Sequence, residues 1–236
     1  MNVKSFIFIT LSFLIGAFAI NAQNIEILSS NQTITLPDGQ TVYCLKGTII
    51  AKDSHGNIIS FVPSTDLVLQ TPTGQKIQVK GGKEVDLFSS GQLKKFTPSK
   101  SMSLKTASGQ MIKVSPEQEV ALNEDGTLRY ATSLEVSKVH TGNNLFFSIL
   151  ANTPIVFDNK GSVISAYPAS DLTFKVQGKE ITCMQGKKIQ FYSNGNLASC
   201  YLAKQVTLVD SNGKQINLSP GAQVFLTKDG YVKAVR

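Results

Sequence analysis

The 236-residue chain is poor in the side chains that most often carry catalysis or hold metals. It contains two histidines, three cysteines and no tryptophan. His55 and His140 have no partner at the spacing of metal ligands. A serine nucleophile would need a histidine base with an orienting acid, and a glycosidase would need two converging carboxylates; neither pattern is visible. The sequence therefore predicts a protein that is not an enzyme and has no metal site and no cofactor.

Long apolar segments and runs of like charge are also missing after the first twenty residues. The chain is 42% hydrophobic and 17% charged, a balance that excludes a disordered chain and a polytopic membrane protein. Its net charge is +7, but the lysines are spread along the chain instead of forming a stripe. We therefore expect solvated outer faces and no nucleic-acid partner.

The N-terminal residues have the pattern of a secretory signal peptide. Lys4 precedes an apolar stretch over residues 6–19, and small and polar residues follow over 20–24. The stretch is too short and too one-sided for a good transmembrane span, and nothing later in the chain is long and apolar enough to be one. We expect export.

The boundaries of the mature protein follow from this pattern. We expect residues 1–22 to be removed by cleavage after Ala22, with residues 17–19 as a second candidate cleavage site. Residues 23–236 would then form a single β-repeat domain without a transmembrane segment. Its location would be the periplasm, the cell surface or the extracellular space.

Glycine recurs at a fixed interval along the chain. One series is Gly56, Gly91, Gly126, Gly161, Gly195 and Gly230, with spacings of 35, 35, 35, 34 and 35, and a second with the same spacings is Gly39, Gly74, Gly109, Asn144, Gly178 and Gly213. Asn144 fits the second series because asparagine tolerates positive φ best among the non-glycine residues. One deletion between Gly161 and Gly178 explains both spacings of 34.

The residues around these glycines predict antiparallel hairpins. Asp125-Gly126, Asn194-Gly195 and Asp229-Gly230 are dipeptides that tight hairpin turns favour. Apolar residues at spacing two flank the turns, and polar residues stand between them at one phase of the repeat: Gln78, Lys113, Ser148, Thr182 and Asn217. Such alternation indicates strands with one buried face and one wet face.

Prolines mark the joints between the hairpins. Pro63, Pro98 and Pro168 share one phase of the repeat, and Pro116 and Pro220 share another. Proline cannot donate to a β-ladder, so we expect corners at these joints. The predicted fold is all-β: five to six units of about 35 residues, each with two hairpins, arranged as two packed sheets or as a β-roll.

One segment carries a family resemblance. Residues 191–197, Phe-Tyr-Ser-Asn-Gly-Asn-Leu, followed by Leu202-Ala203, resemble the Phe-x-x-Asn-Gly-x-Leu units of exported bacterial β-repeat proteins and, more loosely, variant MORN repeats. Residues 20–23, Ile-Asn-Ala-Gln, resemble export signals of Bacteroidota-type bacteria. The resemblance implies export and a β-repeat array, and it transfers no catalytic residue.

The three cysteines fall on core phases of the repeat. Cys44 and Cys183 occupy the phase of Val79, and Cys200 occupies the phase of Phe96. We expect them to act as packing residues, as buried free cysteines often do, so that Cys200→Ala would change stability little. Cys183 with Cys200 is the only plausible bridge, because Cys44 lies several repeats away.

Six aromatic residues are the candidate ligand surface. The repeat pattern predicts that Phe88, Tyr192 and Phe225 face outward. Tyr130, Tyr167 and Tyr201 lie just beyond the turns of the first glycine series, so the six residues could form a strip. The strip could bind an envelope glycan, a peptide or a partner protein. Cross-strand pairing that stiffens an exposed sheet is the simpler interpretation, and we favour it.

These observations favour an exported, non-enzymatic binding or structural module of the cell envelope, with an envelope glycan or protein as partner. A periplasmic lipid-handling β-roll is the alternative, and it would need an open apolar groove. A glycan-active enzyme is a third and weaker interpretation, because a site assembled from distant repeats is invisible to motif analysis. Acids such as Asp125, Asp158 and Asp229 lie at or near hairpin turns, where carboxylates have structural roles.

Overall fold

The computed structural model describes residues 24–236, which divide into two compact units, 24–97 and 98–236. The predicted signal peptide, residues 1–22, lies outside the described residues. The strands pair antiparallel within each unit, which confirms the predicted all-β array of hairpins. The same residues contain no helix that could cross a membrane. That residues 23–236 form a single domain stays a prediction.

The strands are short and follow one another closely. The first unit contains β1 (Asn24–Ile27), β2 (Gln32–Thr35), β3 (Thr41–Cys44), β4 (Ile49–Lys52), β5 (Ile58–Val62), β6 (Leu67–Gln70), β7 (Lys76–Val79), β8 (Val85–Leu87) and β9 (Leu93–Phe96). The second unit begins with β10 (Met102–Lys105), β11 (Met111–Val114), β12 (Val120–Leu122), β13 (Leu128–Ser133), β14 (Ser137–His140), β15 (Phe146–Ile149), β16 (Thr153–Phe157) and β17 (Val163–Ala166). It continues with β18 (Leu172–Val176), β19 (Lys179–Cys183), β20 (Ile189–Phe191), β21 (Leu197–Tyr201), β22 (Val206–Val209), β23 (Gln215–Leu218), β24 (Gln223–Leu226) and β25 (Val232–Val235).

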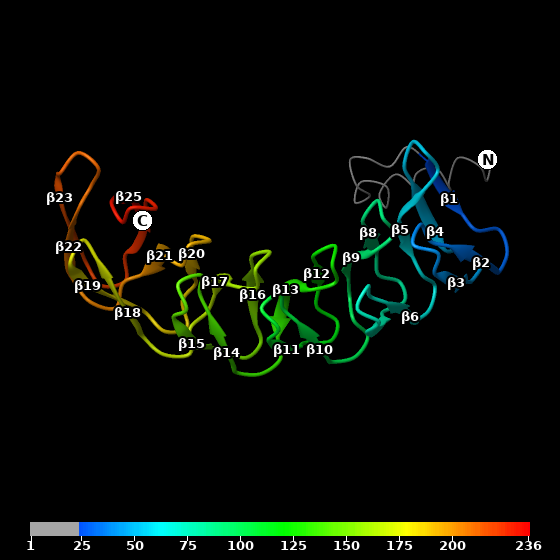
Figure 1. Cartoon of the computed structure of the whole chain (residues 1–236), viewed down its shortest axis with the longest axis horizontal. Coiled ribbons are helices and arrows are strands. Elements are labelled where there is room, and N and C mark those ends of the chain that lie inside the picture. The colour runs from blue at the N-terminus through cyan, green and yellow to red at the C-terminus, as the bar shows by residue number, and fades with distance from the viewer. Residues whose placement is uncertain (1–23) are drawn as a thin grey trace, which may run out of the picture. The chain divides into compact units, whose positions relative to one another are not determined.

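Two kinds of hairpin alternate along the chain. The main-sheet hairpins pair with one another, in the order β1-β4-β5-β8-β9 in the first unit and β12-β13-β16-β17-β20-β21-β24-β25 in the second. The isolated hairpins are β2–β3, β6–β7, β10–β11, β14–β15, β18–β19 and β22–β23, and the two strands of each pair chiefly with one another. In the second unit, Figure 1 shows β16, β17, β20 and β21 above β10, β11, β14 and β15. Within the second unit, the two kinds of hairpin therefore lie in two layers.

The core lies on the apolar faces of both kinds of hairpin. In the second unit, the core side chains of the first two hairpins are at most 1% exposed: Leu104, Ile112, Val114, Val120, Leu122, Leu128 and Ala131. Full burial of one large aliphatic side chain contributes about 1.5–3 kcal/mol. The polar residues predicted to face solvent, which are Gln78, Lys113, Ser148, Thr182 and Asn217, are exposed or half-buried except for Thr182. Thr182 is buried, and its Oγ1 lies 3.4 Å from Oγ1 of Thr173 on the paired strand.

Left-handed residues form the turns, as the glycine series predicts. Gly126 has a φ of 82° and Gly195 a φ of 84°, and Asn144 takes the same region with a φ of 61°. The predicted left-handed conformation of Asn144 is thus confirmed. The amide of Asn144 donates to the carbonyl of Thr141 at 2.9 Å, as glycine does in the equivalent turns.

A third series of left-handed residues closes the corners, and sequence analysis missed it. Its members are Gly47, Gly82, Glu117, Asn152, Gly186 and Gly221, again with spacings of 35, 35, 35, 34 and 35. The amide of Glu117 donates to the carbonyl of Pro98, and that of Gly186 donates to Pro168, both at 2.8 Å. These two prolines are among the predicted corner residues.

The residue missing from the fourth spacing lies in the turn between β18 and β19. The paired residues Val209 and Gln215 enclose five residues in the turn of β22–β23. At the equivalent place, Val176 pairs with Lys179 and encloses only residues 177–178, both with positive φ. The deletion has replaced a longer turn with a two-residue hairpin turn.

Glutamine side chains join isolated hairpins that their backbones leave apart. Gln40 Nε2 donates to the carbonyl of Gln70 at 2.8 Å, and Gln40 Oε1 accepts from the amide of Gln70 at 2.8 Å. Gln177 makes the same two bonds with Val209, at 2.8 and 2.9 Å. A glutamine amide has both a donor and an acceptor, so it can replace the edge of a neighbouring strand. We call these bidentate contacts glutamine clasps.

The clasp of Gln177 predicts a measurable loss of stability. Gln177→Ala keeps the Cβ atom and so leaves the backbone strain of the turn unchanged, but it removes the bonds to Val209 and a third bond to the carbonyl of Gly230 at 3.0 Å. We expect a loss of about 1–3 kcal/mol in the free energy of unfolding, measured by urea denaturation. The control is Gln215→Ala, an exposed strand residue. Equal effects of the two substitutions would contradict a stabilising role for the clasp.

Candidate binding site

The six predicted aromatic residues are all half-buried, but the structure does not show them as one surface. Phe88 belongs to the first unit and the other five to the second. A cation lies 5.3–5.9 Å from the ring centre in three cases: Lys94 over Phe88, Lys187 over Tyr201 and Arg236 over Phe225. Such contacts contribute about 0.5–1 kcal/mol at exposed sites. They favour the stiffening role of the aromatics, and ligand binding by the strip stays a prediction.

Two of these aromatic residues do lie together. Tyr192 and Phe225 line a shallow hollow of about 290 Å³ on the outer face of the main sheet, with Gln190 and Ile164. The hydroxyl of Tyr192 donates to the carbonyl of Leu226 at 2.7 Å. This bond links neighbouring main-sheet hairpins, so the polar atom of the tyrosine already has a structural partner. Tyr130, Tyr167 and Tyr201 do not line this hollow.

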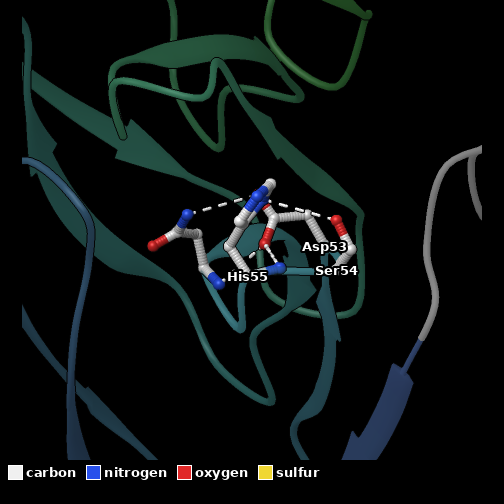
Figure 2. Close-up of polar contacts among 4 residues, drawn as sticks. Asp53, Ser54 and His55 are labelled. Atoms are coloured by element: carbon white, nitrogen blue, oxygen red, sulfur yellow. Dashed lines mark hydrogen bonds and ion pairs between the residues drawn. The ribbon is translucent and has the colours of Figure 1, made fainter.

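The turn between β4 and β5 brings together an aspartate, a serine and a histidine. Figure 2 shows Asp53, Ser54 and His55, with Ser54 Oγ 3.3 Å from His55 Nδ1. Asp53 Oδ1 accepts from the amides of His55 and Asn57, both at 2.9 Å. Burial acts to raise the pKa of Asp53, but these hydrogen bonds hold it below its ordinary value. Asp158 caps the equivalent turn in the same way, so the cluster is a turn cap.

The other ionisable groups also have local explanations. Burial, together with the neighbouring carboxylate of Asp86, raises the pKa of Glu84, and Asp86 lies 3.5 Å from Lys95. His140 is half-buried, with its ring 5.6 Å from that of Phe146. Within residues 24–236 there is no group of three or more His, Cys, Asp or Glu side chains that could hold a metal ion.

The cysteines require a correction. Cys183 and Cys200 form a disulfide with Cα atoms 5.7 Å apart, so the expectation that both act only as packing residues is wrong. Cys183 lies on β19 and Cys200 on β21, and the β-bridge between Cys183 and Leu202 brings these two strands together. The bond therefore joins an isolated hairpin to the main sheet. Cys44 is buried and free, as expected, and burial raises the pKa of its thiol.

The second unit has a larger hollow between its turns. It has a volume of about 530 Å³, within the range of about 300–1,000 Å³ that small-ligand sites occupy. Its lining comes from the turns of β14–β15, β20–β21 and β24–β25 and from β18 with its turn: the lining side chains include Asn144, Phe174, Lys175, Asn196, Lys228 and Asp229. We call it the turn hollow.

The turn hollow follows from the short turn of β18–β19. At two other places in the second unit a main-sheet turn touches the backbone of an isolated hairpin's turn. A Cβ atom on Gly161 would clash with the amide nitrogen of Ser108, and one on Gly195 would clash with that of Asn143. Gly230 occupies the equivalent position, where a Cβ atom would meet only Val176 Cγ1, at 3.1 Å. The shortened turn at residues 177–178 leaves space beside Gly230, and the hollow occupies this space.

Several polar side chains of the turn hollow have no partner. Within the described part of the chain, no hydrogen bond or ion pair engages the side chains of Asn144, Lys175, Lys228 or Asp229. Beside them is the half-buried ring of Phe174, whose centre lies 5.8 Å from that of Phe191. Two ammonium groups oppose one carboxylate, so the hollow has a net positive charge. None of the six predicted aromatic residues lines it.

Comparisons with known proteins give no family for this chain. No protein-family model matches it, and neither does any curated protein. Among solved structures, it is similar to the TCP10 domain of CPAP from Danio rerio, determined in complex with a peptide of Danio rerio STIL. That match has 17% sequence identity and covers 80% of this chain and 99% of the other, with a TM-score of 0.14. A TM-score this low supports no inference about this chain.

The disulfide predicts that stability depends on oxidation. Its two cysteines are 17 residues apart, and closing a loop of about this length stabilises a protein by about 3 kcal/mol. We expect Cys200→Ala to lower the free energy of unfolding by about that amount and to abolish the effect of a reductant on the melting temperature. Cys44→Val is the control, because it should leave the reductant effect unchanged. A wild-type protein that melts at the same temperature with and without reductant would contradict the bond.

Proposed function

We propose that the protein is an exported, non-enzymatic binding module of the cell envelope and that it binds its partner at the turn hollow. One observation carries this proposal: unpartnered polar side chains converge on a concave surface beside an aromatic ring. Small-molecule sites combine these features, because a few convergent polar groups orient a ligand while an apolar surface contributes contact area.

Two independent features support export. The first is the signal-peptide pattern of residues 1–22. The second is the disulfide between Cys183 and Cys200, because disulfides persist in oxidising compartments and are rare in the cytosol. The disulfide needs no assumption about the N-terminal residues, so its presence strengthens the proposal.

The chemistry of the hollow supports binding without catalysis. Its polar lining consists of amides, ammonium groups, one threonine hydroxyl and one carboxylate, and no histidine lies among the lining residues to activate that hydroxyl. The lipid-handling alternative would need an open apolar groove, whereas the apolar residues Ile155, Phe157 and Val163 of the main sheet are at most 1% exposed. No observation favours that alternative over a polar ligand.

The proposal makes four predictions for the exported protein and for purified mature protein. Its intact mass should correspond to a start near Gln23, and immobilised mature protein should retain a component from envelope glycan or protein fractions. Organic extraction of the purified protein should release no stoichiometric lipid. The double variant Lys175→Ala/Lys228→Ala, which removes both ammonium groups from the hollow, should retain less of the bound component.

Three outcomes would contradict parts of the proposal. Exported protein that still contains Met1 would contradict signal cleavage. Stoichiometric lipid in the extract would favour the lipid-handling alternative. Failure to retain any glycan or protein component would contradict the binding role itself.

A further inference from the structure

Resting on the proposed function, we propose that the turn hollow of the second unit binds an oligosaccharide that contains uronic acids, that is, sugar rings that carry both hydroxyls and a carboxylate. The proposal identifies the ligand class from the charge of the hollow, from its free amide and from its aromatic ring.

The charge of the hollow favours an anionic ligand. Lys175 and Lys228 are exposed and unpartnered, and Asp229 is the one lining carboxylate. Two positive charges against one negative charge leave an excess that attracts a carboxylate on the ligand. Because all three side chains are exposed, salt should weaken this attraction.

The amide of Asn144 is suited to recognise hydroxyl groups. An amide provides one oxygen acceptor and two hydrogen donors, and neighbouring sugar hydroxyls can use both. Two other amides at the hollow are already engaged: Gln177 forms its clasp with Val209, and Asn196 Nδ2 donates to the carbonyl of Lys228 at 3.1 Å. A third, Asn143, accepts from the hydroxyl of Thr141 through its Oδ1, so among the amide side chains that line the hollow that of Asn144 is the one with no hydrogen bond in the described part of the chain.

The backbone at Asn144 supports a functional role for its side chain. Its φ of 61° lies in the left-handed region, where the other five members of the series have glycine. A non-glycine residue in the left-handed region has a strained backbone, and such strain tends to occur at functional sites. The turn also fixes the position of the residue, because its amide donates to the carbonyl of Thr141.

Phe174 provides an apolar surface next to these polar groups. Its ring is half-buried, and packing against Phe191 restricts its orientation. Sugar rings have apolar C–H faces that can pack on an aromatic ring, while their hydroxyls and carboxylates point outward. The hollow thus presents a ring, a free amide and two cations to one ligand. An acidic peptide is the alternative ligand, and the binding test includes polyglutamate for this reason.

The test measures binding of the mature protein to three uronate oligosaccharides: oligogalacturonate, oligomannuronate and hyaluronan fragments. Isothermal titration calorimetry should detect at least one of them. For the oligosaccharide that binds, its carboxyl methyl ester should bind about tenfold more weakly, because esterification removes the charge and keeps the hydroxyls. Higher salt should also weaken binding.

Three variants locate the site. Lys175→Ala and Lys228→Ala should each weaken binding about tenfold, because each removes a charge-assisted contact. Asn144→Gly should weaken binding without lowering the melting temperature, because glycine suits the left-handed turn. The matched control is Lys214→Ala, an exposed lysine in the turn of β22–β23 that does not line the hollow.

Each contrary outcome overturns the inference in a recognisable way. Failure of all three oligosaccharides to bind would overturn it, while retention of an envelope component would still support the proposed binding role. Binding that the hollow variants leave unchanged would place the saccharide elsewhere. Polyglutamate that binds more tightly than the oligosaccharides, and loses affinity in the same variants, would identify an acidic peptide as the ligand.

Discussion

The constraint on which this structure depends is that only one of its two hairpin types forms a backbone ladder with its neighbours. The main-sheet hairpins pair edge to edge within each unit, whereas the two strands of each isolated hairpin bond chiefly to one another. The second layer must therefore be held by other contacts. The buried apolar faces, the corner bonds of the third left-handed series, the glutamine clasps and the disulfide provide them. Because an isolated two-stranded hairpin is only marginally stable in water, these contacts determine where the second layer lies.

Much of the fold could be predicted from the sequence because turns and strand faces leave local signals. The recurrence of glycine located the turns, and the alternation of apolar and polar residues located the buried faces. Asn144 could be placed in the glycine series from the sequence alone, because asparagine tolerates the same left-handed conformation. The third series was missed because Glu117 and Asn152 interrupt it: a glutamate gives no indication of a left-handed backbone.

The candidate site was predicted less well. The position of a residue within the repeat does not show how far it lies from a residue in the other layer. Cys183 and Cys200 were correctly placed in the core, yet nothing in their spacing showed that β19 and β21 approach one another closely enough for a bond. The turn hollow left one trace in the sequence, the single spacing of 34. That spacing identified a shortened repeat, but only the packing around Gly230 shows that the shortening opens a space.

The central claim is that the 35-residue repeats within residues 98–236 are interchangeable modules. Deleting one repeat tests this claim most directly. Removing residues 127–161 joins Gly126 to Ser162 and keeps every later strand in phase, whereas removing residues 127–144 joins β12 to β15 and mixes the two hairpin types. The account predicts that the first variant keeps its β-sheet circular dichroism and melts cooperatively with reduced stability, as in repeat proteins whose modules contact chiefly their neighbours, while the second unfolds. Complete unfolding of both variants would contradict the account.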